Sequence, residues 1–253
     1  MPTALITGAS SGIGKEIAKK LSDVGYDLIL AARRGDKLTE VSCQLRSPAE
    51  IIPIDLSKEE NCYSLYERCR NRNIDVVVNN AGFGYFGNFC ETELVREMEM
   101  IDLNVRALHI LTKLFLKNFY EKNSGKILNV ASAAGFMPAG PLLSTYYATK
   151  AYVLSLTRAV AKELKKSGSN VTVSALCPGP VKTEFDAVAG VEFGGVGMNA
   201  ERVADIAVKG MLDGKTVIIP GAIMKVGKFL VKILPDSVLA AFAYKFQKAK
   251  EDR

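Results

Sequence analysis

The stretch Ala4-Leu5-Ile6-Thr7-Gly8-Ala9-Ser10-Ser11-Gly12-Ile13-Gly14 near the N-terminus decides the fold. Its first four residues form a short apolar run of the kind that makes a buried strand. The glycines that follow allow positive φ angles and a close approach of the backbone to a ligand. The helix expected at Gly12–Val24 begins with free N–H groups and a partial positive charge. A strand, a glycine turn and a helix in this order predict a binding site for a pyrophosphate.

The glycines follow the spacing G-x-x-x-G-x-G, which differs from the commoner G-x-G-x-x-G of dinucleotide sites. A glycine cluster by itself also fits an ordinary tight turn. Its place directly between a strand and a helix is what favours the phosphate site. The expected contacts with the pyrophosphate are Gly8, Ser10, Ser11, Gly12, Ile13 and Gly14.

Short apolar runs alternate with amphipathic segments along the rest of the chain. The runs are rich in Ile, Val and Leu without alternating polar residues, which is typical of buried parallel strands. The expected strands are Ala4–Thr7, Asp27–Ala31, Glu50–Ile54, Val76–Asn79, Gly125–Ala131, Asn170–Leu176 and Thr216–Ile219. The expected helices are Gly12–Val24, Lys37–Leu45, Lys58–Arg72, Glu91–Tyr120, Ser144–Ser167 and Ala200–Asp213. This order predicts an α/β fold, a Rossmann-type doubly wound parallel sheet of about seven strands with helices on both faces.

Residues 1–253 contain no linker, internal repeat or low-complexity tract, so we expect a single domain with two variable elements. The first is the substrate loop 184–200, within the glycine-rich segment Pro178–Met198 that we expect to be long and mobile. The second is the tail 221–253, in which apolar residues stand beside lysines. Such a tail fits contact with an anionic membrane surface, or a helix packed against the domain or a partner subunit. We favour the packed helix.

The composition is that of a soluble globular protein, with 48% hydrophobic and 24% charged residues. The net charge of +6 fits solubility or a patch for an anionic partner such as a phosphorylated cofactor, and no nucleic-acid partner is expected. Five cysteines without a C-x-x-C pair disfavour a disulfide framework and a zinc site, and they fit a reducing cytoplasm. The single histidine, His109, cannot support a multi-histidine site and is expected in the core or a groove, so no metal is expected.

The end of the second expected strand indicates which dinucleotide binds. NAD sites usually place an acidic residue there, about 20 residues after the glycines, to hold the ribose 2′-hydroxyl. This strand instead ends Leu30-Ala31-Ala32-Arg33-Arg34. Guanidinium groups bind phosphate in a bidentate way, so Arg33 and Arg34 favour NADP(H), with Lys37 as a weaker addition. The alternative is a pair of solvated arginines on a loop.

Several further motifs stand in the order and spacing of the short-chain dehydrogenase/reductase family, which the chain resembles from about Thr3 to Thr183. They are Thr7–Gly14, Asn79–Gly82, Asn104, Ser132, Tyr146–Lys150 and Pro178-Gly179. Taken alone, Asn79–Gly82 also fits a strand-ending turn. The resemblance implies a homodimer or homotetramer formed through the two long helices.

The same resemblance implies cofactor contacts beyond the glycine turn. Asp55 and Leu56 would lie against the adenine. Asn80, Ala81 and Gly82 would line the wall beside the adenosine ribose. The residues expected over the nicotinamide are Pro178, Gly179, Val181 and Thr183.

Carbonyl reduction needs a hydride, which the cofactor supplies, and a proton, which the protein must supply. Tyr146 is the candidate acid, and Lys150 shares its helix face one turn later. A nearby cation favours a phenolate, so we expect Lys150 to lower the pKa of Tyr146 from its free value of about 10. Ser132 is placed to hydrogen-bond the substrate oxygen. By resemblance, Asn104 holds a water that links Lys150 to solvent. An Asn in mid-helix indicates a kink or a function, or else a surface residue.

The sequence leaves alternatives open at the proton donor and for the substrate. Tyr147 also faces Lys150, but the family pattern Y-x-x-x-K selects Tyr146 as the proton donor. Tyr146 and Lys150 are both expected to contact the cofactor as well. A non-catalytic dinucleotide sensor or scaffold would share the fold, yet such proteins typically lack the tyrosine or the lysine. We therefore expect an NADP(H)-dependent oxidoreductase acting on a small-molecule carbonyl or alcohol. The apolar loop 187–198 favours a hydrophobic or bulky carbonyl compound, with a 3-oxoacyl thioester, a hydroxysteroid-like ring and a small aldehyde or ketone all open.

Overall fold

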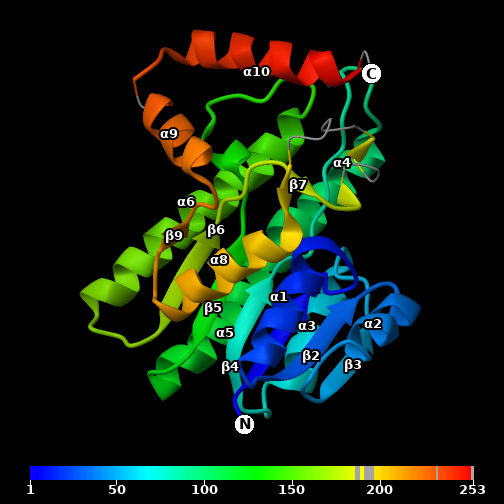
Figure 1. Cartoon of the computed structure of the whole chain (residues 1–253), viewed down its shortest axis with the longest axis vertical. Coiled ribbons are helices and arrows are strands. Elements are labelled where there is room, and N and C mark those ends of the chain that lie inside the picture. Colours follow the sequence, from blue (N-terminus) through cyan, green and yellow to red (C-terminus); the bar gives the residue numbers. More distant parts are fainter. Residues whose placement is uncertain (186–188, 191–196, 232, 252–253) are drawn as a thin grey trace.

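A seven-stranded sheet in the order β3-β2-β1-β4-β5-β6-β9 forms the centre of the molecule (Figure 1). The computed structural model describes residues 1–185, 189–190, 197–231 and 233–251. The strands are β1 (Thr3–Thr7), β2 (Asp27–Ala32), β3 (Ala49–Pro53), β4 (Ile74–Asn79), β5 (Lys126–Val130), β6 (Thr172–Leu176) and β9 (Val217–Ile218). All neighbouring pairs are parallel, and the order reverses between β1 and β4. This is the Rossmann-type doubly wound sheet, so the expected fold class and its seven strands are confirmed.

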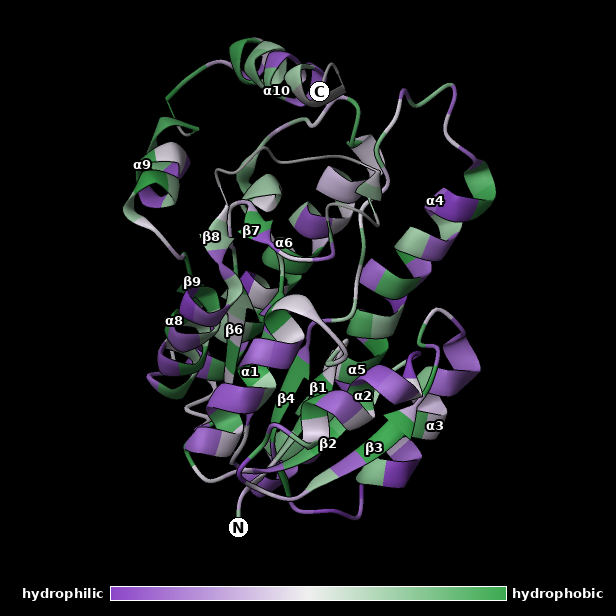
Figure 2. Ribbon diagram, turned by 45° about the vertical axis from the view of Figure 1, so that its right-hand side comes forward, coloured by the Kyte–Doolittle hydropathy of each residue, from purple (hydrophilic) through white to green (hydrophobic). Residues whose placement is uncertain are grey.

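Helices cover both faces of the sheet, and Figure 2 shows apolar strands between helices whose outer sides are hydrophilic. The helices are α1 (Gly12–Asp23), α2 (Gly35–Ser42), α3 (Glu59–Cys69), α4 (Leu94–Ile101), α5 (Leu108–Lys122), α6 (Ser144–Lys166), α8 (Ala200–Leu212), α9 (Ala222–Leu230) and α10 (Asp236–Glu251). In β1, Ala4 and Ile6 pack with α1, α2 and α8, whereas Leu5 packs with α3 and α5 on the other face. Because side chains alternate along a strand, burying both faces requires apolar residues at every position.

A chain of buried polar side chains joins β4 and β5 to the helices on one face. The Asn79 side-chain amide donates to Thr112 Oγ1 on α5 (3.0 Å) and to Asn129 Oδ1 on β5 (2.9 Å). Asn129 donates in turn to Thr157 Oγ1 on α6 (3.1 Å). A buried polar group is costly unless it is hydrogen-bonded, so these bonds hold α5 and α6 in one position against the sheet.

The expected helix Glu91–Tyr120 is present from Leu94 to Lys122, but it is not a regular α-helix throughout. The chain forms α4, then a π-helical turn at Asp102–Ala107, and then α5. The turn brings Asn104 into the interior, where its side chain is fully buried and hydrogen-bonded. A π-bulge adds a residue to the helical turn and so redirects the side chains around it. The mid-helix Asn104 thus marks an irregular, π-helical turn and is not a surface residue.

The segment after β6 also differs from the expected long loop. Val181–Lys182 (β7) and Met198–Asn199 (β8) form a small parallel sheet of their own. The parts of the expected substrate loop at residues 186–188 and 191–196 lie outside the described residues. The tail folds into α9 and α10.

His109 is exposed rather than in the core, and its Nδ1 lies 2.8 Å from the Tyr152 hydroxyl. Among the described residues, no helix combines the length and apolar character needed to cross a bilayer.

Candidate active site

The carboxyl ends of β1 and β4 meet at one edge of the sheet, and hydrogen bonds tie them together. The Thr7 hydroxyl accepts bonds from the backbone N–H groups of Asn80 (3.0 Å) and Ala81 (3.1 Å). The Asn80 side-chain amide donates to the carbonyl oxygens of Thr7 and Gly8, each at 3.0 Å. The glycine turn after β1 and the Asn79–Gly82 segment after β4, which are far apart in the sequence, therefore form one wall.

The glycine turn leaves no room for side chains at its critical positions. Gly8 and Gly12 have φ angles of +65° and +56°, in the region that favours glycine. A Cβ on Gly14 would collide with Asn80 Nδ2 and with the Gly8 carbonyl oxygen. Ser11, at the N-terminus of α1, makes no side-chain cap, so the first N–H groups of the helix can receive an anion. The turn therefore fits the pyrophosphate of a dinucleotide.

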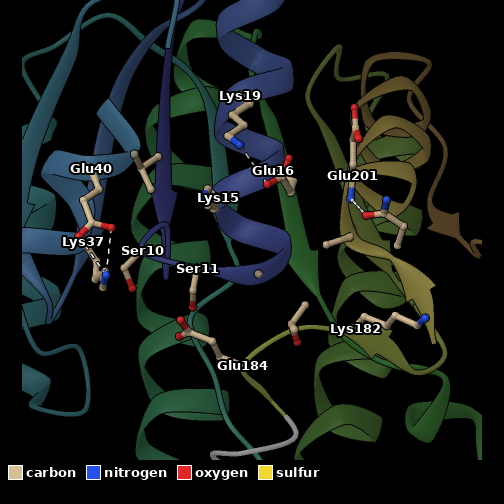
Figure 3. A pocket seen from close by; sticks show the side chains of 15 residues that line it. Ser10, Ser11, Lys15, Glu16, Lys19, Lys37, Glu40, Lys182, Glu184 and Glu201 are labelled. Atoms are coloured by element: carbon tan, nitrogen blue, oxygen red, sulfur yellow. Dashed lines mark hydrogen bonds and ion pairs between the residues drawn. The ribbon is translucent and has the colours of Figure 1, made fainter. Parts of the chain in front are cut away.

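A cavity of about 550 Å³ opens in front of the turn (Figure 3). Its lining residues are Ser10, Ser11, Gly12, Lys15, Glu16, Lys19, Lys37, Glu40, Val41, Lys182, Thr183, Glu184, Asn199, Ala200 and Glu201. Two of its four glutamates, Glu16 and Glu40, pair with Lys19 and Lys37. Hydroxyl groups and cations beside a helix N-terminus suit a phosphorylated ligand.

Arg34 lies at the rim of this site. Its Nη2 is 3.3 Å from Ser10 Oγ and 3.1 Å from Ser11 Oγ, so the guanidinium stands against the glycine turn. Arg33, the other residue expected to select the phosphorylated cofactor, is exposed next to it. The two arginines thus lie on the side of the turn where the sequence places them.

Glu184 is a site residue that sequence reasoning missed. Its Oε2 accepts a hydrogen bond from Arg34 Nη2 at 2.7 Å, and Figure 3 shows it pointing toward Ser11. The bond from Arg34 lowers the pKa of Glu184, so the carboxylate is charged at neutral pH. The ion pair joins residues 150 positions apart, and no local motif marks either one as a partner of the other.

Tyr146, near the start of α6, and Ser132 form a hydrogen-bonded pair. Ser132 follows β5, and its Oγ also accepts a bond from the Ala134 backbone N–H at 3.1 Å, which fixes the hydroxyl. Lys150, one turn after Tyr146 on α6, is buried and donates from Nζ to the Val130 carbonyl oxygen at 2.9 Å. Its Nζ lies 5.8 Å from the centre of the Tyr146 ring. The structure brings all three together.

Burial sets the proton affinities of this group. It raises the pKa of Tyr146 to about 12, a shift that the Ser132 hydrogen bond partly opposes. It lowers the pKa of Lys150 to about 8, because a buried ammonium loses its hydration. The protein by itself therefore keeps the phenol protonated at neutral pH. The expectation that Lys150 lowers the phenol pKa is not met in the protein alone, since the ammonium is bonded to Val130 rather than to the phenol oxygen.

Asn104 lies behind this group, held by the π-helical turn. Its side chain exchanges two hydrogen bonds with the Phe83 backbone, at 3.0 and 2.8 Å, and donates to Thr149 Oγ1 at 3.2 Å. A Cβ on Gly82 would lie 2.6 Å from Asn104 Oδ1 and 3.5 Å from Lys150 Nζ. The absence of a side chain at Gly82 is therefore what lets Asn104 and Lys150 approach.

Of the remaining expected cofactor contacts, four lie in the segment after β6, and Asp55 and Leu56 lie away from the cavity. Pro178 accepts a hydrogen bond from Ala133 N–H (2.8 Å), which places it beside Ser132, and Thr183 lies against Gly12. Val181 begins the small sheet, and Gly179 faces Met224 of α9. Asp55 instead accepts bonds from the backbone and hydroxyl of Ser57, and Leu56 is buried in the core. Neither Asp55 nor Leu56 lines the cavity.

The tail and Phe185 supply further contacts that sequence reasoning missed. Gln247 of α10 is buried and donates to the Tyr147 hydroxyl at 2.9 Å. The Phe185 ring lies 5.5 Å from the Tyr146 ring. Tyr147 is thus engaged with the tail, whereas Tyr146 is the tyrosine that meets Ser132, as the Y-x-x-x-K spacing predicts.

Known proteins resemble this chain over most of its length. A family model described as short chain dehydrogenase matches residues 2–190. An uncharacterised oxidoreductase of Staphylococcus epidermidis is 35% identical over 209 residues, which cover 81% of this chain and 88% of the relative. An uncharacterised oxidoreductase of Bacillus subtilis is 33% identical over 187 residues, covering 72% of this chain and 69% of the relative.

Solved structures share the same architecture. A short-chain dehydrogenase from Sphingobium yanoikuyae in complex with NADPH is 31% identical, with a TM-score of 0.82 over 93% of this chain and 96% of that one. A bulky-bulky ketone specific alcohol dehydrogenase from Comamonas testosteroni is 26% identical, with a TM-score of 0.78 over 94% and 96% of the two chains.

The crowding at Gly14 predicts the effect of adding one methyl group. Gly14→Ala should open the turn, because its Cβ would meet backbone as well as the Asn80 amide. We expect about tenfold or greater loss of affinity for a nicotinamide dinucleotide, measured by fluorescence titration, since the phosphate would lose its bonds to the turn. Gly227→Ala is the matched control, because a Cβ there meets no atom within 4 Å. Equal affinities of the two variants would contradict the assignment of the turn.

Proposed function

The chain belongs to the short-chain dehydrogenase/reductase family, and we propose that it is an NADP(H)-dependent oxidoreductase that reduces a carbonyl group. The observation that carries this proposal is the half-buried Tyr146–Ser132 pair with the buried Lys150 one turn later, in the same fold as the phosphate turn. A proton donor, a group to hold an oxygen and a cation thus stand next to a dinucleotide site.

The proposed cofactor residues divide by the part of NADP(H) they would hold. Gly8–Gly14 would bind the pyrophosphate, and Arg33 and Arg34 the 2′-phosphate. Asp55 and Leu56 would lie at the adenine, Asn80–Gly82 at the ribose, and Pro178, Gly179, Val181 and Thr183 over the nicotinamide. When bound, the reduced nicotinamide supplies the hydride. The exposed guanidinium groups next to the turn and the NADPH complex of the similar Sphingobium yanoikuyae protein support the phosphorylated form.

The proposed proton route runs through the side chains of this chain. Ser132 would hold the substrate oxygen, and Tyr146 Oη would donate its proton to that oxygen. Negative charge then develops on the phenol, and a protonated Lys150 would stabilise it across the short distance to the ring. Lys150 would return a proton to Tyr146 and be recharged from solvent through a water held near Asn104.

Carbonyl reduction is the direction that the proton affinities favour. A phenol with a pKa of about 12 is protonated at neutral pH and ready to donate. Alcohol oxidation would need the phenolate, which burial disfavours in the protein alone. A positive charge on an oxidised nicotinamide would lower this barrier, so the reverse reaction would depend more strongly on the bound cofactor.

We propose a hydrophobic, bulky carbonyl compound as the substrate class. Phe185 lies beside Tyr146, and α10 is anchored to Tyr147 through Gln247, so aromatic and tail residues surround the proton donor. The similar Comamonas testosteroni enzyme is described as specific for bulky-bulky ketones. A 3-oxoacyl thioester, a hydroxysteroid-like compound and a small aldehyde or ketone are the other classes to compare.

The proposal extends to the protein's assembly and location. Members of this family are commonly oligomeric, and we propose a homodimer or homotetramer formed through α4, α5 and α6. We place the enzyme in the cytoplasm, where its free cysteines would stay reduced. The chain would act as a single domain with the substrate loop and tail as its variable parts.

Tyr146→Phe should abolish turnover while NADPH binding survives, because only the proton donor is removed. We expect kcat to fall by about 10²- to 10⁴-fold, the usual range for loss of a general acid. Loss of NADPH absorbance with a panel of carbonyl compounds, with NADH in parallel, measures turnover, and fluorescence titration measures binding. Tyr147→Phe is the control and should retain activity. An inactive Tyr147→Phe beside an active Tyr146→Phe would reverse the assignment, and NADPH binding by the wild type without turnover of any compound would favour a sensor.

The pKa of Lys150 predicts the pH profile of reduction. Because burial lowers this pKa to about 8, the amine is charged below that pH and neutral above it. Only the charged form stabilises the developing phenolate, so kcat/KM should fall about tenfold per pH unit on the alkaline side. Measurement of kcat/KM for a carbonyl substrate from neutral pH upward tests this. A rate that stays level to well above the Lys150 pKa would rule out the charged lysine as the active form.

Arg34 should control the preference for NADPH over NADH. Arg34→Ala should raise the KM for NADPH by about ten- to a hundredfold, as expected for one charged hydrogen bond, and leave the KM for NADH nearly unchanged. Arg46→Ala removes an exposed arginine that pairs with Asp23 instead, and serves as the control. Glu184→Gln releases Arg34 from its carboxylate partner and should lower the KM for NADPH by up to about fivefold. Equal effects of Arg34→Ala on both cofactors would remove Arg34 from the phosphate site.

A further inference from the structure

We infer that α9 and α10 form a docking surface for an anionic phospholipid membrane. The two helices lie together at the end of the molecule opposite the N-terminus (Figure 1). We call their solvent-facing side the tail surface, and it comprises Ile223, Val226, Phe229, Leu230, Val238 and Phe242. The inference does not depend on the proposed substrate.

Large apolar side chains on the tail surface are mostly exposed to solvent. Ile223 is 79% exposed, Phe229 63% and Phe242 67%. α9 has no buried residue at all, although most of its side chains are apolar. Monomeric soluble proteins rarely expose contiguous apolar patches of this kind, and such patches commonly mark binding sites for proteins or membranes.

Positive charge is concentrated in the same segment. Residues 221–253 contain seven Lys and Arg against three Asp and Glu, so they hold +4 of the protein's net charge of +6. Between Gly221 and Lys250 the only acidic residue is Asp236. Lys225 and Lys245 are exposed next to the apolar side chains. A helix with an apolar side and flanking lysines is the type that lies in the headgroup region of anionic bilayers.

The opposite sides of both helices are anchored to the protein, which holds the tail surface outward. On α10, Leu239, Ala243 and Gln247 are buried at successive turns. On α9, Met224 packs against Gly179, and Lys228 Nζ lies 5.4 Å from the centre of the Phe136 ring. The expectation that the tail packs as a helix against the domain holds for these inner sides. The six side chains of the tail surface stay exposed.

Charge distinguishes a membrane from a second copy of the chain as the occupant. In a two-fold dimer the same patch meets itself, so the lysines of one tail surface would face those of the other. Asp236 alone cannot neutralise them. An anionic lipid headgroup layer accepts the apolar side chains and neutralises the exposed lysines beside them, such as Lys225 and Lys245.

Docking in this orientation would also bring the membrane close to the candidate site. α9 contacts Gly179, and α10 contacts Tyr147, the neighbour of Tyr146. A hydrophobic carbonyl compound dissolved in the bilayer would then have a short route to the proton donor; this consequence alone rests on the proposed function.

The chain contains no tryptophan, so a single introduced one reports its own surroundings. Phe229→Trp places the probe on the tail surface, and Phe89→Trp places it at an equally exposed site elsewhere, since Phe89 is also 63% exposed. We expect the emission of Phe229→Trp to shift to shorter wavelength with vesicles of phosphatidylcholine and phosphatidylglycerol. We expect no shift for Phe89→Trp, nor for either variant with phosphatidylcholine alone.

Lysine variants test the charge contribution by vesicle co-sedimentation. Lys225→Gln with Lys245→Gln should weaken partitioning into the anionic vesicles by about fivefold for each lysine removed. Lys58→Gln with Lys209→Gln removes two exposed lysines outside the tail surface and the proposed subunit interface, and should leave partitioning nearly unchanged. Added salt should weaken binding of the wild type, because it screens the charges.

Three results would overturn the inference. Equal shifts of both tryptophan probes, or equal loss from both lysine pairs, would mean that the tail surface has no special part in vesicle binding. A Phe229→Trp shift that follows protein concentration without vesicles, with light scattering showing a smaller assembly for Phe229→Ser, would assign the tail surface to a second copy of the chain.

Discussion

The close approach of β1 and β4 at the edge where the strand order reverses is the constraint on which the site depends. The connections from these two neighbouring strands leave toward opposite faces, so a crevice opens between them. Asn80 closes its floor by donating to the carbonyl oxygens of Thr7 and Gly8. Such short distances between two loop backbones exclude a side chain at Gly14, and they leave the N-terminus of α1 directed at the crevice. A phosphate site follows from this geometry because the backbone itself supplies the donors.

At the other end of the crevice, burial shifts the pKa values of Tyr146 and Lys150. The polar chain from Asn79 through Asn129 to Thr157 fixes α6 against the sheet, and α6 carries both Tyr146 and Lys150. Once fixed, the two groups sit in an environment that opposes charge, which moves their pKa values apart, to about 12 for Tyr146 and about 8 for Lys150. The phenol therefore keeps its proton at neutral pH, while the ammonium gives up its proton more readily than a free lysine does. The Val130 carbonyl bond to Lys150 provides the polar contact that makes a buried lysine tolerable.

The segments after β6 connect the two ends of the crevice to the surface of the molecule. Glu184 reaches Arg34 at the phosphate end, while Met224 and Gln247 reach Gly179 and Tyr147 at the proton-donor end. The tail and the segment after β6 therefore contact residues at both ends of the crevice. A change in the surroundings of the tail would affect Tyr146 and Tyr147, because α10 holds Tyr147 by a partly buried hydrogen bond.

The sequence by itself determined the sheet, the glycine turn and the Tyr146–Lys150 pair, because these depend on local periodicity and on spacings within one helix or turn. The π-helical turn at Asn104 appeared only as a hint, since the bond that Asn104 makes to Phe83 joins two separate parts of the chain. The Arg34–Glu184 ion pair, the Gln247–Tyr147 bond and the raised pKa of Tyr146 needed the tertiary structure. The two contacts join residues that are distant in the chain, and the pKa shift arises from burial. Contacts of that kind and burial leave no pattern along the sequence.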